Sequence, residues 1–325
     1  MKRVIIDQQG KAQLYFLLIV FINLTIFSLI VTGVVIGIKG YISDTRSVYT
    51  SITCCKSICS TCFFTFHTIA TILPWVCIII LFVGICAAIY KALYVLYRNN
   101  SLIHSLPSLS IECYPKLKKI AHRMHFHNQL VLLDNRGLHY AFTLGLWKPK
   151  VYISLGLCFY LTKKELQAVL LHEAQHKKNK DPLKLFIIQT LHALNFFLPI
   201  NHYLLNRFSS ASEKAADDSA VNVTKEPIEL ASALVKICKS NQTAALYPFV
   251  LYFKGQNVTE DRIRRLLEPQ MPPPDLFKVY LYSSGFLSLF IATILFLSLF
   301  YKFLLPAYAL DCTAKTCHIV KCGQS

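Results

Sequence analysis

The residues best suited to chemistry form one short motif, His172-Glu173-Ala174-Gln175-His176. On an α-helix a four-residue step turns through about 400°, so both imidazoles face the same side and can bind one Zn²⁺ at about 2.0–2.1 Å. Glu173 lies beside them, where it can accept a proton from a water whose pKa zinc lowers to about 7. The motif therefore predicts a zinc hydrolase with His172 and His176 as ligands and Glu173 as the catalytic base.

Local sequence signals predict that this motif is helical. Thr162 and Glu165 have the spacing of a capping box, which begins a helix over residues 165–179 that ends before Pro182. The competing interpretation is a chance match on a surface helix, and the apolar turn ahead of the motif argues against it.

A catalytic zinc ion needs a third protein ligand and an open fourth position. The nearest acidic residues downstream are Asp181, Glu213, Asp217 and Asp218. We favour Glu213 because it lies on a separate predicted helix, residues 203–222, that can pack against the first. Asp217 lies one turn further on and could orient a ligand histidine without binding the metal itself. Asp181 is a second candidate for that orienting role. The alternative for each of these three is an ordinary surface or helix-end charge.

Mostly helical elements surround the motif. Two short strands are predicted at 130–133 and 151–154, with a turn at 134–137 between them. Further helices are predicted at 183–198, 228–240 and 260–267. The first of these is almost wholly apolar but short for a membrane span, so we expect it to be buried or seated at the membrane face.

Three apolar segments are long enough to cross a membrane, at 13–38, 73–97 and 279–305. They fit a chain that is 54% apolar and only 16% charged. The first segment is too long for a cleaved signal peptide and lacks a small-residue cleavage site. Residues 63–72 could form a re-entrant or interfacial approach to the second segment, broken by Pro74.

The distribution of lysine and arginine favours a cytoplasmic N-terminus and a cytoplasmic domain between the second and third segments. The net charge of +17 then reflects segments that face anionic lipid, since no nucleic-acid-binding motif accompanies it. We expect an N-terminal membrane region with two spans at 1–97, a cytoplasmic zinc peptidase domain at 98–277, and a third span with a short tail at 278–325. The expected fold class is a mainly α membrane protein whose inserted, mostly helical peptidase domain contains a small β element.

Seven of the 12 cysteines are expected outside the membrane, in the loop after the first span and in the C-terminal tail. They are Cys54, Cys55, Cys59, Cys62, Cys312, Cys317 and Cys322. Disulfides are the favoured interpretation in that compartment, with one thiol left over because the number is odd. A metal site at these clusters is the alternative, although their spacing is not a complete zinc-ribbon pattern.

Several stretches resemble signatures of the BlaR/MecR-type membrane zinc peptidases, which belong to the gluzincins. They are residues 141–153, 165–171 with Asp181, 195–200, 213–217 and 262–267. The resemblance covers roughly residues 73–305. It implies one zinc ion held by His172, His176 and Glu213, with Glu173 as general base. It also implies a site at the cytoplasmic face of the inner membrane that cuts proteins, sometimes the chain itself, to relay an outside signal.

The sequence departs from the penicillin-sensing members of that group. Those members carry a large extracytoplasmic domain with a Ser-x-x-Lys nucleophile after the last span, whereas residues 306–325 follow it in this sequence. They also usually have three spans, rather than two, ahead of the protease domain. We therefore do not expect this chain to sense β-lactams.

The expected function is that of an endopeptidase that cleaves protein substrates at the cytoplasmic face in a regulatory signal relay. The alternatives are a quality-control protease for membrane proteins and a non-catalytic scaffold or signalling subunit. The expected partners are the lipid bilayer and a protein substrate, either a regulator or a membrane protein. Self-cleavage and a homo-oligomer are further alternatives, and no nucleic-acid partner is expected.

Overall fold

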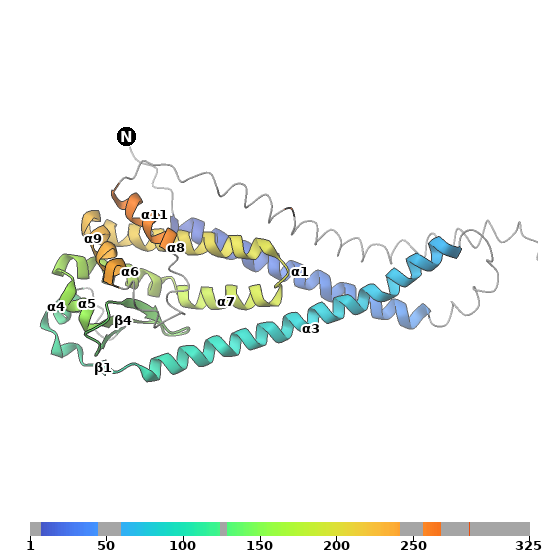
Figure 1. Cartoon of the computed structure of the whole chain (residues 1–325), viewed down its shortest axis with the longest axis horizontal. Coiled ribbons are helices and arrows are strands. Elements are labelled where there is room, and N and C mark those ends of the chain that lie inside the picture. Colours follow the sequence, from blue (N-terminus) through green and yellow to red (C-terminus); the bar gives the residue numbers. More distant parts are fainter. Residues whose placement is uncertain (1–7, 45–59, 124–128, 241–255, 268–285, 287–325) are drawn as a thin grey trace, which may run out of the picture. The chain divides into compact units, whose positions relative to one another are not determined.

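The computed structural model describes residues 8–44, 60–123, 129–240, 256–267 and 286. Helices dominate this part of the chain and accompany a small four-stranded sheet (Figure 1). The prediction of a mainly helical chain with a small β element is therefore confirmed.

Two of the described helices are long and apolar enough to cross a membrane, judged by length and composition alone. The candidate spans are Gln8–Val35 within α1 (Gln8–Asp44) and Trp75–Ser105 within α3 (Ser60–Ser105). They overlap the first two predicted segments. The third predicted segment, 279–305, lies outside the described residues apart from Phe286.

Helix α3 is continuous across Pro74, so the predicted break at that residue is wrong. The sequence signal for a break was the proline, which removes one backbone donor from a helix. Apolar membrane helices tolerate such a residue because local adjustments and neighbouring groups satisfy the freed carbonyl. The apolar approach and the second predicted span therefore form one helix of 46 residues.

The chain divides into two compact units. One comprises Met1–Ile19, Tyr90–Thr190 and Asn201–Lys278, and the other comprises Val20–Ile89, Leu191–Ile200 and Val279–Ser325. The first unit contains the sheet and the His172–His176 motif, so it is the unit that carries the candidate chemistry.

The sheet has the strand order β1-β2-β4-β3. Its strands are β1 (Ser108–Leu109), β2 (Leu130–Leu133), β3 (Ala141–Leu144) and β4 (Lys150–Ser154). β2 and β4 run parallel, and β3 returns antiparallel along β4. The chain turns after β3 at Gly145, whose φ of 108° is a conformation that glycine adopts readily. The predicted strands 130–133 and 151–154 are confirmed as β2 and β4, whereas β3 was not predicted.

The core of the first unit lies between the sheet and the helices packed on it. Leu166, Val169 and Leu170 of α6 (Lys163–Lys178) are buried there. Side chains from the sheet, α4 (Pro115–Arg123) and α5 (Leu155–Tyr160) surround them, including Leu117, Ile120, Leu132, Val151, Ile153 and Leu157. Burying this apolar stripe fixes the rotation of α6 about its axis, and with it the direction of the motif side chains.

Helix α6 begins at the predicted capping box, which is confirmed. The backbone N–H of Glu165 donates to Thr162 Oγ1 at 3.3 Å, and the backbone N–H of Thr162 donates to Glu165 Oε2 at 2.8 Å. Ser232 and Lys236 of α9 (Pro227–Ser240) also contact this carboxylate, at 2.6 and 2.8 Å. Burial would raise the pKa of Glu165, but these donors together hold it below its usual value. The start of α6 is therefore tied to α9.

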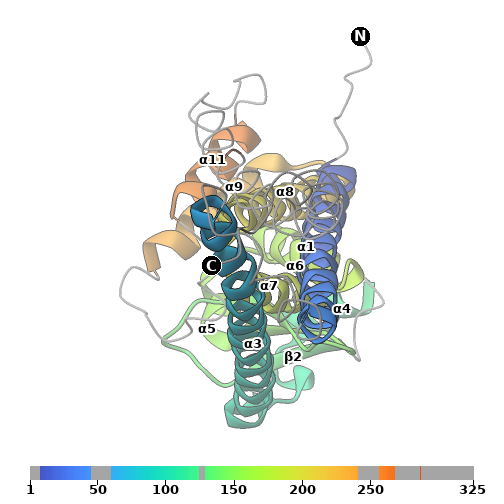
Figure 2. The same cartoon turned by 90° about the vertical axis from the view of Figure 1, so that its right-hand side faces the viewer.

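Four further helices were predicted from the sequence and are confirmed with shifted ends. They are α7 (Asp181–Leu194), α8 (Pro199–Thr224), α9 and α11 (Gln256–Leu267). α9 and α11 lie side by side in both views (Figures 1 and 2). Ile263 and Leu266 of α11 pack there against Leu230 and Leu234 of α9, so α11 has an apolar anchor of its own.

The second unit contains a buried polar contact on a candidate membrane helix. Asn23 of α1 is 0% exposed, and the side-chain amide of Asn195 donates to its backbone carbonyl at 3.0 Å and to its Oδ1 at 2.8 Å. A Cβ added to Gly84 of α3 would lie 2.3 Å from the carbonyl oxygen of Leu194. The turn after α7 therefore packs closely against both α1 and α3.

The capping box makes a prediction about stability. Thr162→Ala leaves the Glu165 backbone N–H without its side-chain acceptor, so we expect the free energy of unfolding to fall by about 1 kcal/mol. Denaturant unfolding of the detergent-solubilised chain, followed by circular dichroism, measures this change. Ser240→Ala, which removes only a hydroxyl bonded to the Ile237 carbonyl, is the control. Equal unfolding midpoints for the two variants would contradict a stabilising cap.

Candidate metal centre

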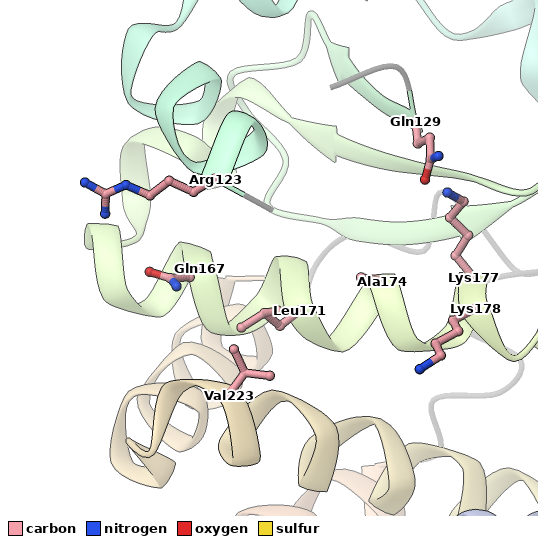
Figure 3. Close-up of a pocket in the computed structure, with 8 residues that line it drawn as sticks. All are labelled: Arg123, Gln129, Gln167, Leu171, Ala174, Lys177, Lys178 and Val223. Atoms are coloured by element: carbon pink, nitrogen blue, oxygen red, sulfur yellow. The ribbon is translucent and has the colours of Figure 1, made fainter. Parts of the chain in front are cut away.

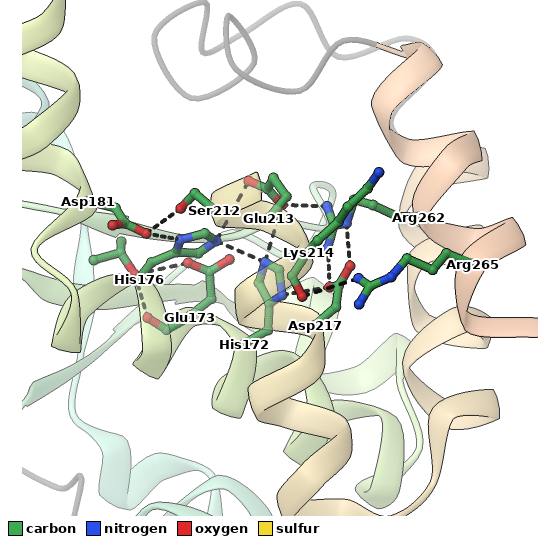
Figure 4. A network of polar contacts seen from close by, with 11 residues as sticks. His172, Glu173, His176, Asp181, Ser212, Glu213, Lys214, Asp217, Arg262 and Arg265 are labelled. Carbon is green, nitrogen blue, oxygen red and sulfur yellow. Dashed lines mark hydrogen bonds and ion pairs between the residues drawn. The ribbon is translucent and has the colours of Figure 1, made fainter. Parts of the chain in front are cut away.

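Three side chains from α6 and α8 converge on one point (Figure 4). The Nε2 atoms of His172 and His176 are 3.1 Å apart. Glu213 lies opposite them, with Oε2 3.4 Å from His172 Nε2 and Oε1 3.7 Å from His176 Nε2. Two nitrogens bound to one tetrahedral zinc at about 2.0–2.1 Å lie about 3.3 Å apart, so this spacing suits a metal ion.

The other ring nitrogen of each histidine faces a carboxylate. His176 Nδ1 lies 2.7 Å from Asp181 Oδ2 in a hydrogen bond. His172 Nδ1 lies 2.9 Å from Asp217 Oδ1, an ion-pair distance at an angle that falls short of a hydrogen bond. A carboxylate in this position favours a proton on Nδ1, which leaves the Nε2 lone pairs facing each other. Two such lone pairs repel unless a proton or a metal ion lies between them.

Asp181 stands at the start of α7 and is supported from α8. Ser212 donates to Asp181 Oδ2 at 2.6 Å, and Lys184 Nζ lies 3.6 Å from Oδ1. Burial would raise the pKa of Asp181, but His176, Ser212 and Lys184 together lower it. The side chain therefore stays ionised and can hold the His176 ring in place.

Glu173, the predicted base, is 6% exposed and is oriented from the sheet. Thr143 Oγ1 of β3 lies 3.0 Å from Glu173 Oε2 and 3.0 Å from the Glu173 backbone carbonyl. The Thr143 hydroxyl can donate to either oxygen, so it ties α6 to β3 at the motif. Sequence reasoning missed Thr143, because only the fold brings β3 beside α6.

Arg262 of α11 is the second residue that sequence reasoning left without a role. Its guanidinium is 1% exposed and lies between Glu213 and Asp217 (Figure 4). Burial would raise the pKa of both carboxyl groups, but Arg262 and the neighbouring histidines hold the pKa of each well below its usual value. The only sequence signal was its place in the stretch 262–267, which says nothing about what it contacts.

The charges of the buried centre favour a bound cation. Four acidic side chains meet two basic ones there: Glu173, Asp181, Glu213 and Asp217 against Arg262 and Lys184. A buried carboxylate is costly without a compensating charge. A zinc ion would supply positive charge among these carboxylates, so the donor set and the charge both fit it.

Gln175, the residue just before His176, connects α6 to two other helices. Its side-chain amide donates to Gln9 Oε1 of α1 at 3.1 Å, and its Oε1 accepts from Ser219 of α8 at 3.1 Å. No role was predicted for this position from the sequence. The contact places the first turns of α1 against the motif helix.

The seven cysteines predicted to form disulfides have side chains outside the described residues. A cavity of about 580 Å³ lies along α6 (Figure 3), where Gln167, Leu171 and Ala174 line it together with basic side chains. A helix turns about 100° per residue, so Ala174 points roughly 200° away from His172. The cavity is therefore on the far face of α6 from the metal cluster.

A family model described as BlaR1 peptidase M56 matches residues 1–266, which is most of the chain. No curated protein matches it.

The centre makes a prediction about the pH dependence of zinc binding. Burial would lower the pKa of His176, but the hydrogen bond to Asp181 and the charge of Glu213 raise it to about 9. Below that pH a proton must leave His176 before zinc can bind. Apparent zinc affinity should therefore rise by about tenfold per pH unit between pH 7 and 9, and then level off.

Competition with a zinc-binding indicator at a series of pH values measures this dependence on the purified chain. Asp181→Asn is the matched variant, because it removes the charge that raises the His176 pKa. We expect weaker binding by about 10- to 100-fold and a plateau that begins at lower pH. An affinity that does not change between pH 7 and 9 in the wild type would contradict the prediction.

Proposed function

Because the chain belongs to the BlaR1 peptidase M56 family, and is therefore a metallopeptidase, we propose that it is a zinc-dependent endopeptidase of the membrane. One zinc ion per chain is held by His172, His176 and Glu213. The observation that carries this proposal is the convergence of their ligand atoms, all within 4.8 Å of one another. The acidic partners on both Nδ1 atoms add support, because they leave the Nε2 atoms for the metal.

The residues around the centre have distinct tasks in peptide hydrolysis. Zinc, when bound, supplies a Lewis acid that polarises the peptide carbonyl and makes water acidic. Glu173 accepts the proton of the attacking water and passes it to the departing amine nitrogen. Thr143 holds the Glu173 carboxylate in place for both transfers. Asp181 and Asp217 fix the orientation of the histidine rings.

An extended polypeptide is the substrate that suits the sheet beside the centre. In the described part of the chain β3 pairs only with β4, so it forms one edge of the sheet. Thr143 places that strand next to Glu173. A substrate segment could add to this edge as a further strand, which presents its peptide bonds in sequence. This favours cleavage within a chain over removal of a terminal residue.

We place the site at the cytoplasmic face of the inner membrane and assign it to regulatory signal relay. The distribution of lysine and arginine supports the orientation, and the candidate spans in α1 and α3 support a membrane location. The Gln9–Gln175 contact supports a relay, because a shift at the start of α1 would act directly on α6. The substrate is a regulator or another membrane protein, and the chain itself is a further candidate.

The proposed base makes a direct prediction about catalysis. Glu173→Gln removes the proton acceptor but no zinc ligand, so cleavage should fall by about 100-fold or more while zinc content stays near one per chain. The assay follows cleavage of an unfolded casein, and of the chain itself, by detergent-solubilised protein. Glu260→Gln, at a carboxylate whose side chain is 75% exposed, is the control. Cleavage by Glu173→Gln at the wild-type rate would rule out this mechanism.

The inactive variant also separates a relay from quality control. A Glu173→Gln chain should retain substrates that it cannot cut, because its binding edge and metal centre are intact. Cross-linking in cells followed by mass spectrometry should recover one or a few partners that are absent with the wild type. Recovery of many unrelated membrane proteins would instead support quality control.

A further inference from the structure

The guanidinium of Arg262 contacts two functional carboxylates at once. Its Nε and Nη2 donate to Oδ2 and Oδ1 of Asp217 at 2.8 and 2.7 Å, a two-pronged contact. Its Nη1 lies 2.6 Å from Oε2 of Glu213. Asp217 in turn faces Nδ1 of His172. The buried guanidinium therefore contacts both the candidate ligand Glu213 and Asp217, the carboxylate that faces His172.

This arrangement constrains the geometry as well as the charge. The planar guanidinium offers donors in fixed directions, so it sets the plane of the Asp217 carboxylate. On Glu213 it engages Oε2, which leaves Oε1 available to a metal ion. A lysine ammonium would supply the same charge but could not hold two carboxylates in a fixed relation.

We propose that Arg262 is a positioning residue for the metal centre. It sets the orientation of the Glu213 ligand and, through Asp217, that of the His172 ring. This inference rests on the proposed zinc site. It predicts that metal affinity and coordination geometry depend on the planar shape of the Arg262 guanidinium, and not only on its charge.

Helix α11 is held in place by contacts that do not involve Arg262. Arg265 Nη2 lies 2.5 Å from Asp218 Oδ1, and Asp261 lies 2.5 Å from Lys214 Nζ. Ile263 and Leu266 add the apolar packing already described. Substitutions of Arg262 should therefore leave α11 docked. Arg265 supplies a matched control, because it also pairs with α8 but touches none of the candidate ligands.

The experiment compares Zn²⁺ affinity in the purified full chain for wild type, Arg262→Lys, Arg262→Gln and Arg265→Gln. Competition with a zinc-binding indicator gives the affinity. We expect both Arg262 variants to bind zinc about 10- to 100-fold more weakly, and Arg265→Gln to stay within a few-fold of wild type. Arg262→Lys keeps the buried charge, so it carries the test if Arg262→Gln fails to fold.

A second readout is the visible absorption spectrum of the Co²⁺-loaded chain, which reports coordination geometry. The spectrum should change in Arg262→Lys and stay unchanged in Arg265→Gln. Wild-type affinity and an unchanged spectrum in Arg262→Lys would overturn the positioning role while leaving the zinc site intact. Equal weakening in Arg265→Gln would also overturn it, because the loss would then follow from displacement of α11. A wild-type chain that binds no zinc would overturn the proposed function itself.

Discussion

Carboxylates buried side by side repel one another unless cations lie among them, and this constraint governs the contact of α6 with α7, α8 and α11. The centre gathers four acidic side chains but only two basic ones, Arg262 and Lys184. Its two histidines present their Nε2 atoms to each other at 3.1 Å. Both features favour a divalent cation at this point. Contacts elsewhere in the first unit offset the free-energy cost of burying these charged groups.

Those contacts come from separate elements, and each element brings one part of the centre. The capping box and the apolar stripe of α6 fix where His172 and His176 point. The start of α7 carries Asp181, α8 carries Glu213, and β3 orients the base. α11 then closes the arrangement from the side of α8. The centre therefore depends on tertiary packing around one helix. Loss of a contact from any neighbouring element should weaken metal binding more than it destabilises α6.

The sequence predicted what depends on near neighbours along the chain. Helical spacing placed His172 and His176 on one face, and the capping pair and the strand 130–133 follow from residues a few positions apart. It could not show that Arg262 reaches Glu213, because their contact depends on how α8 and α11 pack. The predicted helix break at Pro74 was wrong for a similar reason, because the groups around a proline decide whether a helix tolerates it. The predicted third span and cysteine pairs lie outside the described residues and stay predictions.

The central claim is that Glu213 joins the two histidines as a zinc ligand. Elemental analysis of the purified chain, as wild type and as Glu213→Ala, tests it most directly. We expect about one zinc per wild-type chain and a large loss of zinc from the variant after dialysis against a weak chelator. A Glu213→Ala chain that keeps its full zinc content under the same conditions would contradict it.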